Sequence, residues 1–467
     1  KFHFLNHTSI VLQHEGYYLL LDPWPSEFLS FNSWKAHPPC FLDNNILASF
    51  VNSSEKKLGV VISHGHDDHC DDDFLKKVNS STPVFFPKYK GKGPSKRLEK
   101  NNLENVSELS SLQNTSFGPF KLCSYIIEDH SLDDAIVIIS TDDYIFVHAN
   151  DNSVKFPSEL IEYILNDRDG YKKVFFASQT GIANGYPYCY PQFAVDNDFS
   201  KMKKIALDKI KKTVQIAIDN ANLVKSDHFI SYAAYTISMS LLEEYGSEIL
   251  PAIFLPTPSN LKKLSLNWGK VGLLDYVPGD TFDFTNNSIS KPFWLENNNF
   301  ENIASELQKL RLKSTKDFRN GLNMNIEKFN NYSITDLMGY LKEYLKKFYE
   351  FILKSEGEVK KEIMKIILEF KIENHASLIL NLKNGSISTN NDLKLNKRII
   401  ISKDNCWLLM SGIFNFESLY IGHHAKFERF PPEKFNKKLM MQLQIFGYIY
   451  QKRLVPPDLL LVRAQKS

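Results

Sequence analysis

The stretch VISHGHDDHCDDD, residues 61–73, places three histidines and five aspartates directly after an apolar run. In an extended chain, residues i and i+2 point to the same side, so His64 and His66 can converge on one metal ion. Asp68 and His69 enter the next predicted helix and can face a second ion. The spacing HxHxDH therefore predicts two adjacent metal sites rather than a solvated polar loop.

The composition is that of an ordinary globular protein. The chain has 467 residues, 43% of them hydrophobic and 24% charged, which is enough for two or three domains. A formal net charge of +2 gives no global field for nucleic acid or an anionic membrane, so we expect neither as a partner. The five cysteines are dispersed, and neither a signal peptide nor an apolar run of ~20 residues is recognisable, which favours a cytoplasmic location.

Two parts of the chain differ in their patterns. Residues 1 to about 255 alternate short β-rich runs with helix-like segments, which predicts an α/β fold. Residues 334–355 carry apolar side chains at helical spacing. Helices are expected between the strands at residues 72–78, 157–166 and 199–222. The predicted domains are a metal-binding domain at 1–300, a helical linker at 301–358 and an α/β domain at 359–467.

The HxHxDH motif is the signature of the metallo-β-lactamase superfamily, which this sequence resembles. The resemblance extends through LNHTSIVLQHEGYYLLLDPW, residues 5–24. It implies an αββα sandwich in which Asp22 orients the metal loop, His130 supplies the third motif and Asp151 bridges two metals. It also implies that His7 lies beneath the metals, while Asp134 would orient His130 from outside the ligand set.

The sequence departs from the family at the fifth motif, which usually supplies a last histidine. The corresponding residues 228–235, HFISYAAY, offer Ser231, Tyr232 and Ala233 instead. His228 could replace the missing ligand, or it could be a solvated histidine at a strand start. The predicted metal ligands are His64, His66, Asp68, His69, His130, Asp151 and, in place of the missing histidine, His228; Asp68 and Asp151 are also expected to act in catalysis.

Residues 128–152, 176–190 and 414–435 further resemble CMP-N-acetylneuraminate hydroxylase-like proteins, a branch that also typically lacks the last histidine. Those hydroxylases carry a Rieske iron–sulfur domain, whose paired Cys and His ligands are not recognisable in this sequence. Residues 359–467 resemble a sterol-carrier-protein-like α/β fold. Such a domain could pack on the first domain or form a homodimer interface.

Two metal ions bridged by Asp151 would permit two chemistries. They could lower the pKa of a bound water and polarise a substrate for hydrolysis, or, as iron, they could serve oxygen chemistry. We predict a diiron oxygenase that acts on a nucleotide-linked or other anionic amino sugar, with a ferredoxin or Rieske protein as electron donor. The alternatives are a zinc- or manganese-dependent hydrolase of a phosphodiester, lactone or amide bond, and an inactive binding protein.

Two segments are predicted to contact the substrate. The first is SQTGIANGYPYCY, residues 178–190, whose glycines permit close approach and whose tyrosines offer stacking faces. The second is the C-terminal segment with a pair of histidines and an arginine. The predicted substrate-binding residues are Gln179, Gly181, Tyr186, Tyr188, His424 and Arg429. The alternatives are an ordinary loop with core aromatics and, for Arg429, a surface ion pair.

Overall fold

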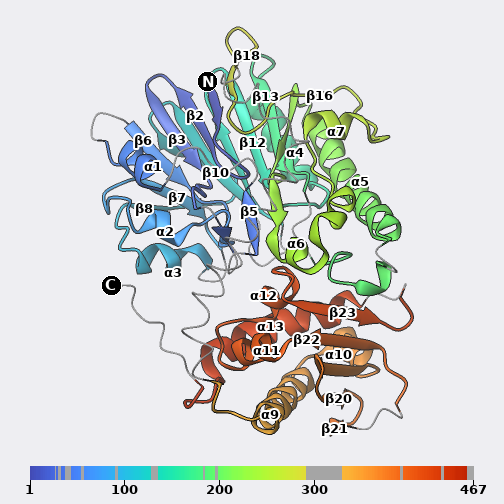
Figure 1. Ribbon diagram of the computed structural model, residues 1–467. Helices are drawn as coiled ribbons and strands as arrows, with labels where there is room; N and C mark the ends of the chain where they lie inside the picture. The colour runs from blue at the N-terminus through green and yellow to red at the C-terminus, as the bar shows by residue number, and fades with distance from the viewer. Residues whose placement is uncertain are drawn as a thin grey trace.

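The computed structural model describes residues 1–26, 28–29, 33–36, 44–53, 57–89, 93–127, 135–181, 185–194, 198–290, 329–389, 393–432 and 436–459. Within these residues the chain forms two large β-sheets that stack face to face, with helices on the outer side of each. The C-terminal residues form a smaller α/β unit that packs against one end of this sandwich (Figure 1).

The first large sheet has eight strands in the order β18-β17-β1-β2-β3-β6-β7-β8. Its last four strands run parallel, so their carboxyl ends lie along one edge. The strands are β1 (Phe2–Phe4), β2 (Ile10–His14), β3 (Tyr17–Leu21), β6 (Lys57–Val61), β7 (Val84–Pro87), β8 (Val106–Leu109), β17 (Thr281–Asp283) and β18 (Ser288–Ser290).

The second large sheet has seven strands in the order β16-β14-β13-β12-β11-β10-β9. Here β12, β13, β14 and β16 run parallel. The strands are β9 (Thr115–Phe117), β10 (Phe120–Ile126), β11 (Ala135–Ser140), β12 (Tyr144–Asn150), β13 (Lys173–Gln179), β14 (His228–Tyr232) and β16 (Gly272–Leu273).

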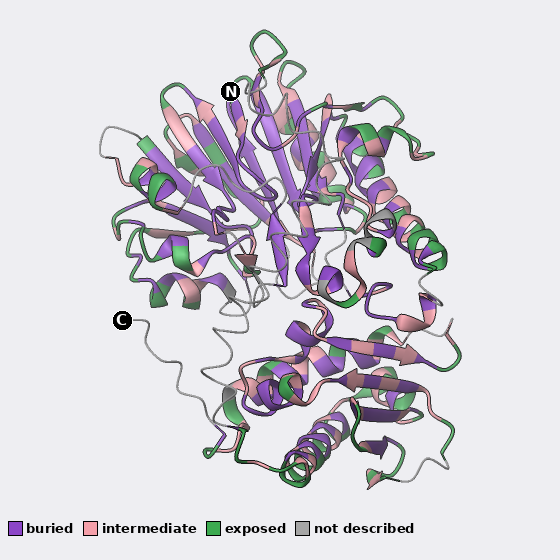
Figure 2. Cartoon of the chain, viewed as in Figure 1, coloured by how far each residue is buried: buried purple, intermediate pink, exposed green. Residues whose placement is uncertain are grey.

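The order of the layers is helix, sheet, sheet, helix. A buried cluster that includes Phe2, Leu21, Phe146 and Ile230 fills the space between the sheets, and each outer face has its own apolar cluster (Figure 2). The helices are α1 (Asn44–Val51), α2 (Asp72–Leu75) and α3 (Gly93–Lys100) on the first sheet, and α4 (Ser158–Arg168), α5 (Ser200–Leu223) and α7 (Pro258–Lys262) on the second. The predicted αββα sandwich is therefore confirmed.

The strands read from the sequence are present because each short apolar run is buried on a pleated sheet. The predicted helices at 157–166 and 199–222 correspond to α4 and α5 within one or two residues. The predicted helix at 72–78 is shorter, because α2 ends at Leu75. No helix among the described residues is long and apolar enough to cross a membrane.

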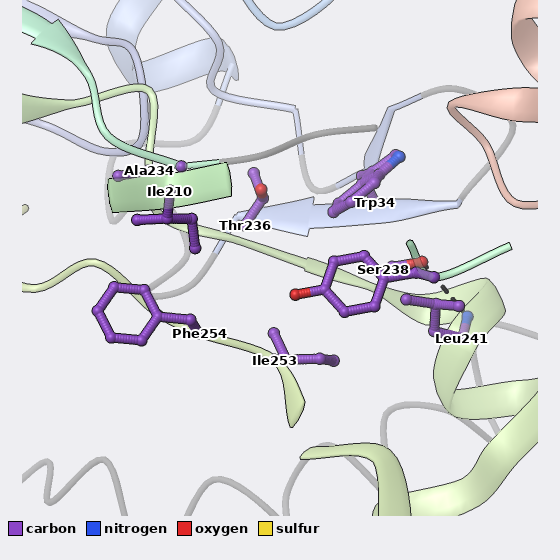
Figure 3. Close-up of a pocket in the computed structure, with 10 residues that line it drawn as sticks. Trp34, Ile210, Ala234, Thr236, Ser238, Leu241, Ile253 and Phe254 are labelled. Carbon is purple, nitrogen blue, oxygen red and sulfur yellow. Dashed lines mark hydrogen bonds between the residues drawn. The ribbon is translucent and has the colours of Figure 1, made fainter. Parts of the chain in front are cut away.

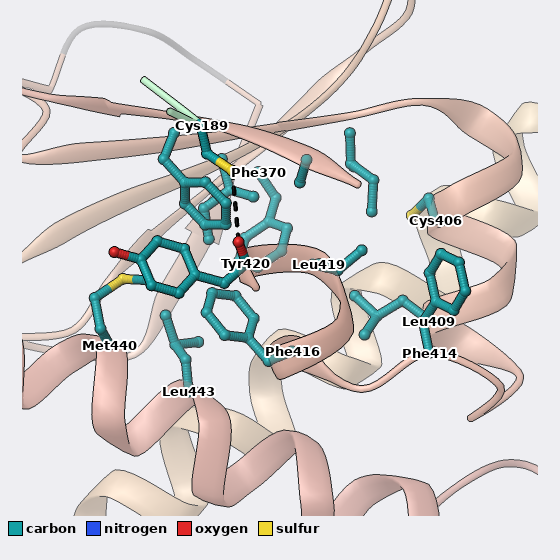
Figure 4. Close-up of a cluster of buried hydrophobic side chains, with 14 of the residues drawn as sticks. Cys189, Phe370, Cys406, Leu409, Phe414, Phe416, Leu419, Tyr420, Met440 and Leu443 are labelled. Atoms are coloured by element: carbon teal, nitrogen blue, oxygen red, sulfur yellow. Dashed lines mark hydrogen bonds between the residues drawn. The ribbon is translucent and has the colours of Figure 1, made fainter. Parts of the chain in front are cut away.

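The C-terminal unit is a five-stranded sheet in the order β21-β20-β19-β22-β23. Its apolar core contains residues of the helices α9, α11, α12 and α13 (Figure 4). Its elements are α9 (Ile334–Leu353), α10 (Gly357–Ile363), β19 (Ile367–Ile372), β20 (Ser377–Asn381), β21 (Ser386–Ser388), β22 (Lys397–Ile401), α11 (Lys403–Met410), α12 (Phe416–Tyr420), β23 (Ala425–Arg429) and α13 (Lys437–Arg453).

Helix α9 lies within the predicted linker at 301–358, and its face with Leu337, Leu341 and Phe348 is buried in the C-terminal core. The sterol-carrier-like character of this unit and the domain boundaries remain predictions.

A small sheet with the order β15-β5-β4 lies where the sandwich meets the C-terminal unit. It consists of β4 (Phe28–Leu29), β5 (Trp34–Ala36) and β15 (Thr236–Ser238), and α6 (Met239–Tyr245) follows directly. The short helices η1 (Pro191–Phe193) and η2 (Gly246–Ala252) complete this region. It connects the carboxyl edge of the large sheets to α12 (Figure 1).

Candidate metal centre

The motif residues lie where parallel strands of the two large sheets end. Asp22 directly follows β3, His64 comes three residues after the end of β6, and Asp151 directly follows β12. The carboxyl ends of parallel strands in layered α/β proteins commonly carry the functional side chains, because loops there are free of the sheet's hydrogen bonding. The fold therefore brings three distant parts of the chain to one place.

His64, His66 and Asp151 form one half of the centre. One ligand atom from each lies within 4.8 Å of the others. His64 Nε2 is 2.7 Å from His66 Nδ1, and both nitrogens lie near Asp151 Oδ2, at 3.8 and 3.9 Å. Two imidazoles and one carboxylate that converge in this way are a suitable donor set for a divalent ion.

Asp68 and His69 form the second half, on the other side of Asp151. His69 Nε2 is 3.4 Å from Asp151 Oδ1 and 3.6 Å from Asp68 Oδ2. Both His69 Nε2 and Asp151 Oδ1 are buried, and among the described residues neither has a hydrogen-bond partner. Buried polar atoms normally have partners, so this pair fits a second metal ion between them.

The Asp22 carboxylate orients the side chains around the centre through hydrogen bonds. Its Oδ1 accepts from Ser63 N at 2.6 Å, and its Oδ2 accepts from Ser63 Oγ at 2.7 Å and Tyr232 OH at 3.0 Å. His69 Nδ1 and His148 Nε2 each lie 2.8 Å from the same Oδ2. A carboxylate that holds one ring nitrogen of a histidine leaves the other nitrogen for metal, so Asp22 aims His69 Nε2 at the cluster.

Electrostatics set the protonation states of the carboxylates. Burial would raise the pKa of Asp22, but the imidazoles of His69 and His148 hold it well below its usual value. Burial likewise opposes ionisation of Asp68, yet His69 and the hydrogen bond with His7 hold its pKa at about 2. Both carboxylates are therefore ionised at neutral pH, which is the form that binds metal.

The pKa values of His64 and His69 are shifted in opposite directions. Burial, together with the nearby His69 and His66, lowers the pKa of His64 well below its usual value. Burial also disfavours a charged His69, but Asp151, Asp68 and Asp22 outweigh it and raise the pKa of His69. A metal ion that binds His69 must therefore displace its proton.

His7 lies against the second half of the centre. Tyr235 N donates to His7 Nδ1 at 2.8 Å, so the ring proton is on Nε2, which lies 3.2 Å from Asp68 Oδ2. The ring also packs edge-on against Trp24, with 5.5 Å between the centroids. His7 therefore donates to Asp68 and orients it, beneath the metal positions.

The remaining aspartates of the motif have structural partners. Asp71 caps α2 by accepting from Asp73 N and Phe74 N. Arg97 on α3 pairs with Asp67 and Asp72, each at 3.0 Å. The negative charge of residues 67–73 is thus divided between the metal centre, a helix N-terminus, Arg97, which the sequence analysis did not single out, and the lysines Lys76 and Lys100.

Gly65 and Cys70 lie among the motif residues, but neither has a special structural or chemical role there. Arg97 Nη1 donates to the Gly65 carbonyl at 2.7 Å, but a Cβ at Gly65 would meet no atom closer than 3.9 Å. Cys70 lies in the apolar cluster with Phe74 and Leu75, and burial raises its pKa to about 12. The thiol therefore serves as a packing group of this cluster.

The structure corrects the suggestion that His228 replaces the fifth-motif histidine. His228 begins β14, whereas the metal centre lies at the opposite, carboxyl end of the strand. Its ring stacks on Phe175 with 5.2 Å between the centroids and contacts Phe282. Among the described residues none of the metal-motif side chains contacts it, because the two ends of β14, His228 and Tyr232, are four positions and therefore about 13 Å apart along the strand.

Among residues 228–235, which were expected to supply the fifth motif, Tyr232 places its hydroxyl between Asp22 Oδ2 and the Thr8 carbonyl oxygen, so its single proton is shared between these two acceptors. His148 on β12 is a second residue that the sequence analysis missed. A histidine in the strand that leads to Asp151, three residues before it, was a recognisable signal for it. Both residues act on Asp22 rather than on a metal position, which leaves His69 as the only described nitrogen donor of the second half.

Some predicted residues lie outside the described part of the chain. His130 and Asp134 fall in residues 128–134, so their placement is not tested. Gln179 ends β13, and Gly181 approaches the chain after β14 so closely that a Cβ would lie 2.8 Å from Ala233 O. Gly181 therefore serves close packing of two strand ends, and a substrate role for either residue remains a prediction.

Arg429 and Tyr186 do not form an exposed substrate surface. Arg429 is only 2% exposed, and its guanidinium lies 4.4 Å from the ring of Tyr186 and 4.8 Å from that of Tyr190. Gln192 also exchanges hydrogen bonds with the Arg429 backbone. This burial corrects the prediction that Arg429 reaches a substrate: it joins β23 to the segment at 185–194 through cation–π contacts.

A small pocket lies between the segments that follow β13 and β14 and the small sheet (Figure 3). Trp34 and Tyr188 provide aromatic faces, while Thr236 and Ser238 provide hydroxyls. Its wall includes Ala234, the neighbour of the residue that binds His7. Tyr188, a predicted substrate contact, lines this pocket, although only 5% of it is exposed.

No protein-family model and no curated protein matches the sequence in these comparisons. Solved structures with a similar arrangement include a possible metal-dependent hydrolase from Veillonella parvula, with 15% identity over 55% of this chain and 95% of that one, at a TM-score of 0.33. CmlA, a diiron β-hydroxylase from Streptomyces venezuelae, is 14% identical over 50% of this chain and 44% of that one, at 0.32. The metallo-β-lactamase fold protein YhfI from Bacillus subtilis is 14% identical over 50% and 85%, at 0.29.

Identities and scores at this level carry no functional argument. The αββα architecture of this chain rests on its own strand order and layers.

Proposed function

We propose that this protein is a dinuclear metal enzyme, and that its metals are iron ions used for oxygen chemistry. One observation carries the proposal: the described ligand atoms of the first half belong to two histidines and one carboxylate, His64, His66 and Asp151, all within 4.8 Å. Two histidines and one carboxylate with open positions are the ligand set of non-haem iron oxygenases and also of some catalytic zinc sites, so the choice of iron depends on the second half.

The second half supports the same assignment. Its described donors are His69 Nε2 and oxygens of Asp68 and Asp151, so oxygen outnumbers nitrogen. Structural and catalytic zinc sites are mostly richer in nitrogen or sulfur, whereas iron and manganese accept carboxylate-rich sites. Since a tyrosine, Tyr232, stands where the fifth motif was expected, the described residues supply this half with no nitrogen ligand besides His69.

Two bound iron ions would supply activation of dioxygen, with electrons from a separate donor such as a ferredoxin or Rieske protein. The residues of the chain bind and orient. Asp22 holds His69 with Nε2 toward the ions, His7 donates to Asp68, and Ser63 holds Asp22 through two hydrogen bonds. Asp151 can contact both halves, since its Oδ1 faces His69 and its Oδ2 faces His64.

We propose a small polar molecule as the substrate class; the pocket of Trp34, Tyr188, Thr236 and Ser238 has room for about one water molecule, so it would have to widen to accept part of such a substrate. In such a substrate a ring would stack on Trp34 or Tyr188, and hydroxyl or amide groups on that ring would hydrogen-bond to Thr236 and Ser238. The resemblance adds an anionic amino sugar as the specific expectation. The burial of Arg429 removes one cation that was expected to recognise the negative charge.

Elemental analysis of protein purified anaerobically without added metal tests the proposal. We expect about two irons per chain in the native protein and loss of iron in His66→Ala and Asp151→Ala. The matched control is His228→Ala, which removes a histidine of the sandwich that lies outside the centre. Zinc or manganese without iron would overturn the oxygenase assignment in favour of hydrolysis, and no bound metal would overturn the enzyme assignment itself.

A further inference from the structure

Helix α12 lies on the side of the C-terminal unit that is turned toward the sandwich (Figure 1). The segment that follows it is anchored to the sandwich at three points. Trp34 Nε1 donates to the Ile421 carbonyl at 2.9 Å. His423 Nδ1 lies 2.7 Å from Ser238 Oγ, and His424 Nε2 lies 2.6 Å from Ser33 Oγ. The position of α12 relative to the centre is therefore set by direct hydrogen bonds.

The anchored segment is also closely packed. A Cβ at Gly422 would lie 3.0 Å from Ser33 Oγ, and a Cβ at Gly185 would collide with the Tyr420 carbonyl oxygen. Asn415 caps α12 by accepting from Ser418 N at 2.7 Å. Within this arrangement Glu417, in the first turn of α12, extends toward the metal loop, where its Oε1 lies 4.0 Å from His66 Nε2.

The three motif histidines use their two ring nitrogens in the same way. Each directs one ring nitrogen at the cluster and the other at an oxygen. His64 Nδ1 contacts Ser63 Oγ at 3.0 Å, and His69 Nδ1 contacts Asp22 Oδ2 at 2.8 Å. In His66 the inward atom is Nδ1, and the outward Nε2 faces Glu417. Histidines that bind metal usually donate their second N–H to such a partner.

We propose that Glu417 is a positioning residue of the metal centre, supplied by the C-terminal unit, and this inference rests on the proposed metal-binding function. A small side-chain rotation that brings Glu417 Oε1 to about 2.8 Å from His66 Nε2 makes a charge-assisted hydrogen bond. That bond holds the proton on Nε2 and directs the lone pair of Nδ1 to the metal position. The centre is then a composite of two parts of the chain.

The effect is expected on metal binding rather than on folding. The side chains of His66 and Glu417 are 45% and 44% exposed, and exposed ion pairs contribute little to stability. Partners of metal-bound histidines typically account for 10- to 100-fold in metal affinity. Because this pair is half exposed, we expect about tenfold, at the lower end of that range.

The experiment compares wild-type protein with Glu417→Ala, Glu417→Gln and the control Glu343→Gln. Glu343 lies on α9, is 58% exposed and pairs with Lys346 at the same distance of 4.0 Å, away from the centre. Co²⁺ affinity is measured anaerobically on metal-stripped full-length protein by competition with a chromophoric chelator. The visible absorption of bound Co²⁺ reports the ligand geometry, and thermal unfolding of the metal-free variants reports the fold.

We expect both Glu417 variants to bind Co²⁺ about tenfold more weakly and with altered absorption bands, while Glu343→Gln matches the wild type. Unfolding temperatures of the metal-free proteins should agree. Wild-type affinity and spectrum in both Glu417 variants would overturn this inference alone. Failure of the wild-type protein to bind Co²⁺ would overturn both this inference and the proposed function.

Discussion

Replacement of Asp22 by asparagine should both destabilise the fold and weaken metal binding. The Asp22 carboxylate is fully buried and accepts from Ser63 N, Ser63 Oγ and Tyr232 OH, with His69 Nδ1 and His148 Nε2 each at 2.8 Å. An asparagine keeps one acceptor oxygen but turns the other atom into a donor. Whichever way the amide is oriented, a donor then faces at least one N–H group.

The magnitude follows from the loss of the charged acceptor. The two hydroxyls can rotate and accept from the new amide, whereas the two imidazole contacts lose a charged acceptor. Hydrogen bonds to charged groups contribute about 1.5–3 kcal/mol each, so two lost contacts amount to roughly 3–6 kcal/mol. Removal of one partner from a buried ion pair has a similar cost of about 3–5 kcal/mol. We expect Asp22→Asn to lower the free energy of unfolding by about 3–5 kcal/mol.

The substitution also changes the proton on His69. If His69 Nδ1 accepts from the side-chain amide that Asp22→Asn introduces, its proton moves to Nε2, which faces Asp151 and the second metal position. Metal binding must then displace that proton without the support of the Asp22 charge. We expect a 10- to 100-fold loss of metal affinity, the range typical for partners of metal-bound histidines.

Urea denaturation of the metal-stripped protein and chelator competition measure the two effects. Asp73→Asn is the control, because its carboxylate is 65% exposed and its ion pair, with Lys76 at 2.8 Å, lies on the surface. That control should stay within about 1 kcal/mol of the wild type. If Asp22→Asn also stays within that limit and keeps its metal affinity, Asp22 is not the organiser of the centre.

Three further changes test other parts of the structure. His228→Ala should leave the metal content unchanged, since the ring stacks on Phe175 rather than on the centre; loss of metal would restore His228 as a ligand. Gly185→Ala should loosen the contact with Tyr420 and speed proteolysis of the C-terminal unit, and an unchanged cleavage rate would contradict that packing. Burial, and then the charge of Arg429, lower the pKa of Lys397 from 10.5 to about 7. The unfolded chain therefore binds the extra proton between those pH values, so the stability should rise from pH 7 to 10 by up to roughly 4 kcal/mol, a rise that denaturation of Lys397→Met should not show.

Much of the fold and half of the centre could be predicted from local patterns. Short apolar runs that end on polar residues predict buried strands with functional ends, as at Leu21–Asp22 and in YIFVHAND. The spacing of His64, His66, Asp68 and His69 is local, so a tight loop after one strand brings these side chains together whatever the rest of the chain does. For this reason the metal motif and the αββα architecture could be read without coordinates.

The remaining features depend on which strand ends become neighbours. Asp22, His148 and Tyr232 come from β3, β12 and β14, and their shared hydrogen bonds exist only because the two sheets stack with those ends together. The same stacking leaves His228 at the far end of its strand and buries Arg429 against aromatic rings. The approach of Glu417 to His66 spans 351 positions in sequence and requires the docked C-terminal unit. Sequence spacing determines which ligands can share a loop, whereas only tertiary packing decides which distant groups orient them.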